Sequence, residues 1–562
     1  MENRTNKVFI ISLDGATFDI LTPLMDQGYM PNLARMSKEG LTGYLESVIP
    51  WVTAPAWTSF MTGKTPGKHG LFDFTRFDET EYRWKVNNAT SIRSKTIWQL
   101  LSEKGKRVMV LNLPYTYPPY PVNGVMVSGW DAPLLEQGFT YPSEFYREIL
   151  DMMPDYGSNL DLPLGSNLAT ESDELFNRFT EKLVRGVEQG VQLSQHLLKT
   201  QPWDVFMVHF QQTDWMQHNL WAYIEKGARD PNDKTPWVEK TRECYRAFDR
   251  AVGVLQREAE KDNPLYIVLS DHGFGPDRGY VFPNYWLSQW GYYKQVEVKE
   301  DPIRAFFHKS DSKVVKGVYN VLSKTKQLVV GNPKRLVKKR YKSFIEYMDQ
   351  TVPRNRMSAD WSRTKVALVV GSEAGFLFVN VKGKSPLGTV EPGAEYEAVV
   401  TDVVNRFREV RNPQNGEKLF TRVDRGRDVY PDADKRVDLP DVVLIPQPGY
   451  GFSYTISDAI PEGSTHGGHR LKGILFLQGE GLRNKVDGFA PRLIDIAPTI
   501  LHLLGLPVPS DMDGRVLEEA FVGAGDVHME QADNSLVQDV KDYSDEESVL
   551  IEERLKGLGY IE

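Results

Sequence analysis

Short runs of β-branched and other apolar residues recur along this chain, with longer stretches of helical periodicity between them. This alternation constrains the fold most, because it predicts an α/β protein whose mostly parallel sheet has helices on both faces. The strand candidates are Val8–Leu13, Val108–Leu113, Val205–Phe210, Tyr266–Leu269, Val442–Ile445 and Ile474–Leu477. The helix candidates are Pro31–Glu39, Ser94–Lys104, Glu174–Leu198 and Lys240–Lys261.

The composition fits a folded, water-soluble protein and excludes several other classes. Of the 562 residues, 41% are hydrophobic and 25% are charged, which is typical of globular domains and not of disordered or low-complexity chains. The single cysteine, Cys244, excludes an internal disulfide framework and a cysteine-rich metal site. No apolar run is long enough to span a bilayer, and the first apolar stretch is too short for a signal peptide. We therefore expect a cytoplasmic protein without a transmembrane segment.

The alternation of strands and helices breaks after residue 300. We predict that residues 1–300 and 437–522 form one catalytic core, and that residues 301–436 are an insertion. The insertion is expected to hold a basic helical segment followed by a small α+β cap. Residues 523–562 are predicted to form an acidic C-terminal tail that ends in a helix, Asp545–Lys556.

The charge is unevenly distributed along the chain. The net charge of −9 argues against a general nucleic-acid-binding protein. Residues 301–344 nevertheless carry 12 Lys and Arg against two Asp, a local charge of +10. One interpretation of this segment is a solvated helix pair whose lysines are simply surface. The other is a lid or docking surface that attracts anionic substrates or lipid headgroups.

Acidic and imidazole side chains follow three of the predicted strands. Asp14 comes directly after the first strand, Asp214 comes shortly after the third, and the pair Asp271-His272 follows the fourth. Ligands of open α/β sheets bind beyond the carboxyl ends of the strands. These side chains are therefore expected to converge on one crevice, although each alone has a common structural role as a turn former or helix cap.

Histidines extend the set. Asp214 and His218 are four residues apart, which places both on one face of a helix and close enough to bind one metal ion. A later glycine-rich stretch contains His466 and His469, and both are candidates. A solvated Asp–His pair is the common explanation of such a spacing when it occurs alone. The joint occurrence of these groups near predicted strand ends is what indicates a metal site.

A hydroxyl-rich segment, Thr53–Gly63, precedes a second turn-forming segment, Pro66–Gly70. Asp, His and a hydroxyl together suit a pair of zinc-like ions, and such a pair about 4 Å apart can hold both the attacking and the leaving oxygen of a displacement at phosphorus. A threonine hydroxyl is a weak nucleophile that metal coordination can activate. The chemistry therefore indicates hydrolysis of phosphate or sulfate esters through a covalent threonine intermediate.

In this order the motifs resemble the alkaline phosphatase superfamily, and in particular its type I phosphodiesterase/nucleotide pyrophosphatase branch. The resemblance covers residues 7–290 and 437–508. It implies an alkaline-phosphatase-like three-layer α/β/α core and a metal-dependent hydrolase of phosphate esters, with Thr53 as the nucleophile. The hydroxyl segment also resembles the sulfatase signature. Sulfatases carry a cysteine or serine, converted to formylglycine, where Thr53 stands here, so the threonine weighs against sulfatase activity.

The resemblance further implies two divalent metal ions, zinc or alternatively manganese. The first would be bound by Asp214, His218 and the late histidine, and the second by Asp14, Asp271, His272 and Thr53. The spacing His-Arg-x-x-Gly-Ile-Leu favours His469 as the late ligand, whereas Thr-His-Gly favours His466. We favour His469 and expect His466 to line the site.

The substrate contacts depart from the family pattern. Nucleotide pyrophosphatases carry an asparagine shortly after a His-Gly pair, which corresponds to His69-Gly70 here. Phe74 stands at the position of that asparagine. Another donor, such as Lys64 or a backbone amide, would then contact the phosphate. Trp57 could stack on a base, although tryptophans near strand ends usually pack in the core. His209 lies inside a strand pattern, where a packed or supporting histidine is expected rather than a ligand.

The most direct functional hypothesis is therefore a phosphodiesterase or nucleotide pyrophosphatase that acts on a small phosphate ester or a nucleotide. A phosphomonoesterase or phosphotransferase could use the same metals and nucleophile. A hypothesis of another class is a non-catalytic protein that binds metal or anions on this scaffold. Rates with a phosphodiester and a phosphomonoester, together with the metal content, separate these hypotheses.

Overall fold

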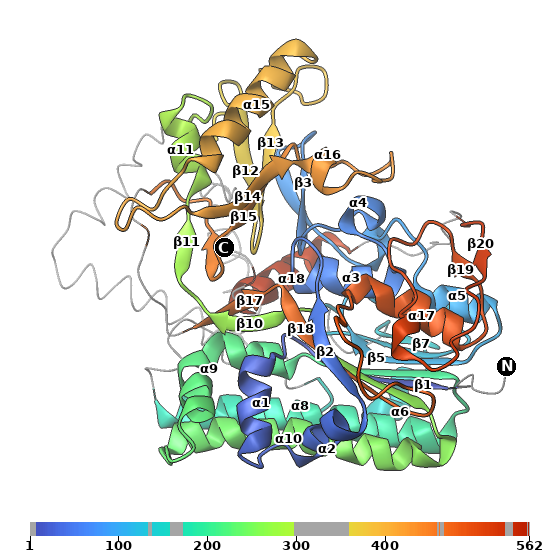
Figure 1. Ribbon diagram of the computed structural model, residues 1–562. Coiled ribbons are helices and arrows are strands. Elements are labelled where there is room, and N and C mark those ends of the chain that lie inside the picture. The colour runs from blue at the N-terminus through green and yellow to red at the C-terminus, as the bar shows by residue number, and fades with distance from the viewer. Residues whose placement is uncertain are drawn as a thin grey trace, which may run out of the picture.

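The computed structural model describes residues 7–132, 138–157, 172–296, 359–457, 460, 466–533, 543–558 and 560. Its centre is an eight-stranded sheet with the order β2-β18-β9-β1-β8-β5-β6-β7 (Figure 1). In that order the strands are Leu41–Glu46, Lys472–Gln478, Leu265–Leu269, Val8–Leu13, Val205–Phe210, Val108–Leu113, Gly124–Ser128 and Thr140–Tyr141. The five strands from β9 to β6 are parallel, and β18, β2 and β7 are joined to them by antiparallel pairs.

The central strands are apolar on both faces because helices cover both faces of the sheet. All six residues of β1 and of β8 are buried, and the two strands pair in register from Val8 with Val205. This arrangement confirms the predicted α/β class with a mostly parallel sheet.

Helices form the two outer layers (Figure 1). One layer contains α1 (Phe18–Asp26), α2 (Pro31–Glu39), α8 (Asp173–Thr200), α9 (Gln212–Arg229) and α10 (Pro236–Ala259). The opposite layer contains α3 (Thr53–Thr62), α4 (Pro66–His69), α5 (Ile97–Glu103) and α17 (Ile496–Leu503). The long helix α8 begins at a serine cap, where the Ser172 hydroxyl accepts a hydrogen bond from the Leu175 backbone N–H at 3.2 Å.

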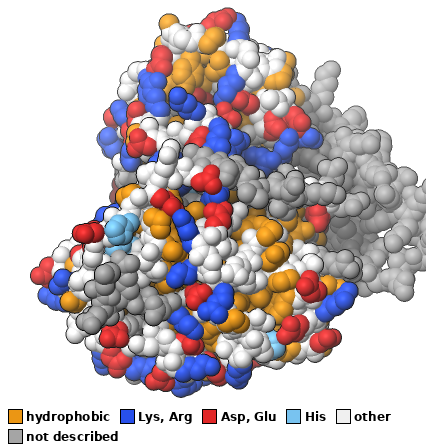
Figure 2. Space-filling view, turned by 90° about the vertical axis from the view of Figure 1, so that its right-hand side faces the viewer, with side chains coloured by type: hydrophobic (Ala, Val, Ile, Leu, Met, Phe, Trp, Pro, Cys, Tyr) orange, Lys and Arg blue, Asp and Glu red, His pale blue; other side chains and the backbone are white. Residues whose placement is uncertain are grey.

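A smaller lobe lies beyond the helices α3 and α4 (Figure 1). Its antiparallel sheet has the order β12-β13-β15-β14, with the bounds Val366–Gly371, Gly375–Val379, Val442–Pro446 and Phe420–Arg425. Helix α15 (Ala394–Arg408) packs on it, and the lobe has its own hydrophobic cluster. On the face that Figure 2 shows, acidic and basic side chains are interspersed over both lobes.

The assignment of Val442–Ile445 to the central sheet was wrong. This run does form a strand, β15, but it pairs antiparallel with β13 and β14 in the smaller sheet. A run of β-branched residues predicts a buried strand without indicating which of two sheets will receive it. The chain returns to the central sheet only at β18.

Shorter elements connect the two lobes and complete the fold. The strand pairs are β3 (Thr75–Asp78) with β4 (Arg83–Val86), β10 (Gly273–Pro276) with β17 (Gly467–Arg470), β11 (Gly279–Val281) with β16 (Tyr450–Phe452), and β19 (Val508–Pro509) with β20 (Met529–Glu530). Within the described ranges, the remaining α-helices are α6 (Phe145–Met152), α11 (Pro283–Gln289), α16 (Gly426–Val429) and α18 (Asp545–Leu558).

The predicted C-terminal helix is confirmed as α18, which packs against the large lobe through the buried side chains of Ile551 and Leu555. The basic segment 301–344 lies outside the described residues, so its expected role as a lid or docking surface remains a prediction. Within the described part of the chain, no helix combines the length and the apolar character needed to cross a membrane.

Candidate metal centre

The site residues lie where strands of the large lobe end. Asp14 follows β1, and Asp271 and His272 follow β9. Asp214 lies in the first turn of α9, directly after β8, and His218 lies one turn later on the same helix. The turn after β1 requires glycine: Gly15 has a φ of +65°, and a Cβ atom there would lie 2.9 Å from the Phe274 ring.

Two further segments complete the site. Strand β17 carries His469, which pairs with Phe274 of β10, so the late histidine lies beside the end of β9. Helix α3 begins at Thr53, which places the threonine at the positive end of the helix dipole. The sequence-predicted residues from positions 14 to 469 therefore meet at the carboxyl edge of the sheet.

The first group of potential metal ligands is Asp214, His218 and His469. Oδ1 of Asp214 lies 3.4 Å from Nε2 of His218 and 3.2 Å from Nε2 of His469. The two imidazole nitrogens are 2.8 Å apart. Three ligand atoms thus point at one position, as a tetrahedral cation with one further open ligand position would require.

The second group is Asp14, Asp271 and His272. Nε2 of His272 lies 3.6 Å from Oδ1 of Asp14 and 3.4 Å from Oδ2 of Asp271. The hydroxyl oxygen of Thr53 lies 3.5 Å from the same nitrogen. The two groups adjoin, because the rings of His272 and His469 stack with their centroids 3.8 Å apart.

The hydrogen bonds of the carboxylates show which oxygens are free to bind cations. One oxygen of each carboxylate accepts a hydrogen bond: Asp14 from the Trp57 indole at 2.8 Å, Asp271 from the Gly15 backbone N–H at 3.3 Å, and Asp214 from the Tyr560 hydroxyl. The other oxygens, Oδ1 of Asp14, Oδ1 of Asp214 and Oδ2 of Asp271, are buried and have no hydrogen-bond partner among the described residues. Buried oxygens without donors are costly unless a cation pairs with them, so the donor set fits two divalent cations.

The histidines are oriented for ligation. Nδ1 of His218 lies 3.1 Å from the carbonyl oxygen of Gly467, and Nδ1 of His272 lies 3.1 Å from that of Gly273. A carbonyl oxygen only accepts hydrogen bonds, so Nδ1 of each ring carries the proton and Nε2 presents its lone pair to the site.

Burial and mutual repulsion strongly perturb the carboxyl groups. Asp14, Asp214 and Asp271 have no exposed surface. Burial, together with the charges of the neighbouring carboxylates, raises the pKa of Asp14 and of Asp271 well above the usual range. Burial also acts to raise the pKa of Asp214, but His218 and His469 outweigh it and hold that pKa well below its usual value.

The side chains of Trp57 and His209 lie next to Oδ2 of Asp14. Trp57 is fully buried, which agrees with the packing alternative and not with stacking on a base, and its indole N–H donates to Oδ2 of Asp14. His209 was expected in the core or in a supporting role, and its Nε2 lies 3.5 Å from the same oxygen and 2.9 Å from Oε1 of Gln211. Burial lowers the pKa of His209 to about 4. Both rings therefore fix the orientation of a candidate ligand.

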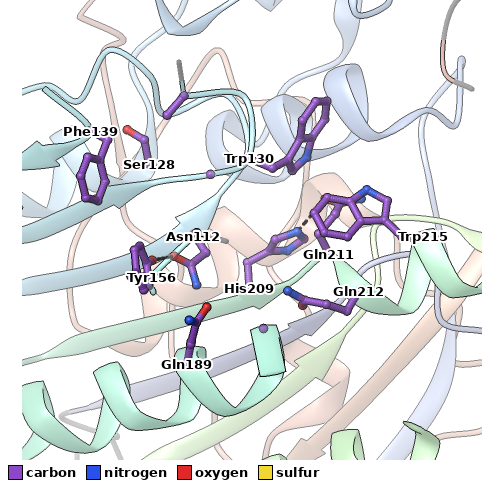
Figure 3. A pocket seen from close by; sticks show the side chains of 14 residues that line it. Asn112, Ser128, Trp130, Phe139, Tyr156, Gln189, His209, Gln211, Gln212 and Trp215 are labelled. Atoms are coloured by element: carbon purple, nitrogen blue, oxygen red, sulfur yellow. Dashed lines mark hydrogen bonds between the residues drawn. The ribbon is translucent and has the colours of Figure 1, made fainter. Parts of the chain in front are cut away.

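A cavity with a mainly apolar lining lies next to this support (Figure 3). His209 and Gln211 face each other across one side of it, with Trp130 and Trp215 nearby. Asn112, Ser128, Gln189 and Gln212 add amide and hydroxyl groups to a lining that also contains Phe139 and Tyr156. The cavity thus borders the residues behind Asp14.

Two of the sequence candidates lie away from the ligand groups. Lys64 follows the far end of α3, roughly 16 Å of helix from Thr53, and its ammonium group pairs with Asp511. This position gives no support to its expected contact with phosphate. Nδ1 of His466 lies 3.1 Å from the carbonyl oxygen of His218, and this histidine belongs to neither ligand group within the described residues. The geometry favours His469.

Three residues at or next to the candidate site were not predicted from the sequence. Glu373, in the turn between β12 and β13 of the smaller lobe, lies 3.6 Å from Nδ1 of His469, and burial raises its pKa. Tyr560 donates a hydrogen bond to Asp214, and Gln211 contacts both the Tyr560 hydroxyl and His209. None belongs to a recognisable motif, and Tyr560 is separated from Asp214 by 346 positions. The only available signal for Gln211 was its position directly after β8.

Comparison with known families agrees with this geometry. The sequence profile of the type I phosphodiesterase / nucleotide pyrophosphatase family matches residues 8–471, which include every candidate ligand described above. The chain belongs to this family. It is a metal-dependent phosphoester hydrolase, as the family assignment indicates.

Solved structures with similar folds include other phosphorus-ester and phosphonate enzymes. A phosphonoacetate hydrolase from Sinorhizobium meliloti 1021, in complex with phosphonoformate, is 14% identical, with a TM-score of 0.47 over 88% of this chain and 94% of its own. Human ectonucleotide pyrophosphatase / phosphodiesterase 5 is 13% identical, with a TM-score of 0.45 over 89% of this chain and 95% of its own.

Proposed function

We propose that this family member hydrolyses small phosphodiesters or nucleotides through a covalent phosphothreonine formed on Thr53. The observation that supports this most directly is the position of the Thr53 hydroxyl. It lies at the start of α3, 3.5 Å from Nε2 of His272, beside two adjoining groups of metal ligands.

Asp214, His218 and His469 would hold one divalent cation, and Asp14, Asp271 and His272 the other. When bound, two such cations, zinc in our proposal, would supply activation of the hydroxyl and neutralisation of phosphate charge. Manganese is the alternative, because carboxylate and imidazole ligands suit both metals.

The chain itself positions the reacting groups. The first turn of α3 directs backbone N–H groups and the positive end of its dipole towards the position of an anionic phosphoryl group beside Thr53. The Thr53 oxygen would form a bond to phosphorus as the bond to the leaving oxygen breaks, and the hydroxyl proton would end on that oxygen, so that the leaving group departs as an alcohol. Water would then cleave the phosphothreonine and regenerate the hydroxyl. The buried setting excludes bulk water from the nucleophile, since Thr53 has no exposed surface.

Thr53→Ala tests the nucleophile. We expect kcat with bis-p-nitrophenyl phosphate to fall by a factor on the order of 10³ or more, because the nucleophile is removed while the metal ligands remain. Thr53→Ser keeps a hydroxyl and is the matched control, with at least partial activity. Acid quenching of the wild type during turnover of this diester, followed by mass spectrometry, should find a p-nitrophenyl phosphoryl group on Thr53. Equal activity of Thr53→Ala and the wild type would exclude the covalent route.

The mono- or diester preference is tested with the same preparation. We expect a higher kcat/KM for bis-p-nitrophenyl phosphate than for p-nitrophenyl phosphate with zinc or manganese present. The opposite order would favour a phosphomonoesterase. No metal in the purified protein and no activity after metal addition would favour a non-catalytic binding protein.

A further inference from the structure

The segment after the C-terminal helix α18 places the side chain of Tyr560 at the candidate metal centre. This residue belongs to none of the motifs identified in the sequence. Tyr560 follows the end of α18 and is 8% exposed. Its hydroxyl donates a hydrogen bond to Oδ2 of Asp214 and accepts one from Nε2 of Gln211 at 3.1 Å. Gln211 directly precedes α9, which carries Asp214, so the hydroxyl bridges two neighbouring points of one segment.

The ring of Tyr560 is held by contacts that do not involve its hydroxyl. It stacks on Phe74 with ring centroids 4.6 Å apart and 16° between the planes. The Trp130 ring lies 5.6 Å away, and the His218 ring meets it nearly at a right angle, also at 5.6 Å. A phenylalanine at position 560 could therefore occupy the same place without the hydroxyl.

Helix α18 is fixed to the large lobe by both apolar and polar contacts. Its inner face is buried at Ile551 and Leu555. The Arg554 guanidinium donates hydrogen bonds to the carbonyl oxygens of Trp130 and of Ala132, the latter at 2.9 Å. The same segment that contacts the Tyr560 ring thus also anchors the helix.

We propose that Tyr560 is a positioning residue of the metal centre and that it orients Asp214 for its cation. This inference rests on the proposed metal centre. The two carboxylate oxygens of Asp214 have different neighbours. Oδ2 accepts a hydrogen bond from the Tyr560 hydroxyl, while Oδ1 faces Nε2 of His218 and Nε2 of His469. Hydrogen-bond partners of a ligating carboxylate fix its orientation, and their loss typically weakens metal affinity 10- to 100-fold.

A second consequence follows from thermodynamic linkage. If the docked Tyr560 strengthens metal binding at Asp214, then metal binding must strengthen the docking of Tyr560 by the same factor. Because Tyr560 lies two residues after the end of α18, the cation and the helix are expected to stabilise each other. The C-terminal segment is then part of the metal centre and not a separate tail.

Zinc titration of the full chain tests the positioning role. We expect Tyr560→Phe to weaken the affinity for zinc about 10-fold or more, measured by competition with a chromophoric chelator. The matched control is Tyr543→Phe, which removes a hydroxyl from the same C-terminal region. The Tyr543 hydroxyl donates to the carbonyl oxygen of Asp131 at 2.9 Å, and its ring stacks on Tyr117. The control should keep its zinc affinity within about twofold, the usual variation for a site without contact to the ligands.

The outcomes are distinguishable. Zinc binding by the wild type with unchanged or tighter binding by Tyr560→Phe would overturn the positioning role, since a hydroxyl that merely blocks the site would give tighter binding. A wild type that binds no zinc would instead overturn the metal centre itself. Equal losses in both variants would assign the effect to helix docking in general, and would also overturn the specific role of Tyr560.

Hydrogen exchange measures the linkage between the cation and the helix directly. Added zinc should slow the exchange of backbone amides in α18 of the wild type, and the effect should be smaller in Tyr560→Phe. Exchange in α18 that is identical with and without zinc, under conditions where zinc binds, would contradict the linkage between the helix and the cation.

Discussion

At the scale of single residues, His69 shows how a motif histidine can be structural. It lies in α4, the segment after α3, and is fully buried. Its Nδ1 accepts a hydrogen bond from the Leu71 backbone N–H at 3.2 Å, and its Nε2 lies 2.8 Å from the Ser59 hydroxyl. Burial, with the nearby Lys64 charge, lowers the pKa of His69 to about 3. The ring is therefore neutral in the folded protein and ties the two ends of this turn together.

The lowered pKa predicts a loss of stability in acid. Below the unfolded-state pKa of about 6.5, His69 is protonated in the unfolded chain but remains neutral in the folded protein. The free energy of unfolding therefore falls as the pH drops from about 6.5 towards about 3. One such group contributes up to about 1.4 kcal/mol per pH unit. We expect His69→Asn to be less stable than the wild type at pH 7.5, with the difference shrinking towards pH 4.5. Urea unfolding at several pH values measures this, and a difference independent of pH would contradict it.

Residue-level features were only partly predictable. The candidate ligands could be proposed from the sequence because Asp14, Asp214 and Asp271 follow predicted strands and because acidic and imidazole side chains suit cations. The roles of Trp57 and Lys64 were not found, since a sequence pattern does not show where an indole N–H or an ammonium group will point. Trp57 donates to Asp14 and Lys64 pairs with Asp511, and both contacts depend on the packing of α3.

At the scale of secondary-structure elements, α18 depends on a few buried side chains. Leu555 is 1% exposed, so Leu555→Ala should weaken the docking of the helix by about 2–4 kcal/mol, as for other buried leucines. Hydrogen exchange of the α18 amides measures this directly, and the weaker docking should appear as faster exchange there.

Lys556→Ala is the matched control on the same helix. Lys556 is half exposed and pairs with Glu552 at 3.1 Å, and an exposed pair at this spacing contributes at most about 0.5 kcal/mol. Equal exchange rates in α18 for the two variants would show that the apolar face does not hold the helix.

The elements themselves followed from periodicity, but their partners did not. Both β1 and β15 were expected as buried strands and are, yet only β1 lies in the central sheet. Likewise, α18 was expected as a helix, while its contact with the metal centre depends on the fold of residues more than 300 positions earlier in the chain. Local pattern specifies the type of an element, whereas its neighbours are specified by the packing of the whole chain.

At the scale of the whole molecule, the metal centre joins distant parts of the chain. Its candidate ligands come from residues 14 to 469, so an unfolded chain cannot present them together. A cation that binds only the folded state stabilises it by about 2.7 kcal/mol when its concentration is 100 times Kd. We expect zinc to raise the Tm of the chelator-treated protein and EDTA to reverse the rise.

Asp214→Ala is the informative variant for this measurement. It removes the only carboxylate of the first ligand group and leaves the second group, Asp14, Asp271 and His272, in place. The rise in Tm with zinc should be smaller in this variant than in the wild type. A Tm of the wild type that does not respond to zinc would contradict a preformed binding site in the fold.

The strand order also bears on when the site can assemble during synthesis. Strand β18, which begins three residues after His469, inserts between β2 and β9, so the sheet is incomplete until that late segment has emerged from the ribosome. A nascent chain that ends before residue 469 lacks a ligand of the first group even if β1, β8 and β9 have already paired. Capture of the first cation is therefore expected to be a late event, after the long-range pairs of the sheet have formed.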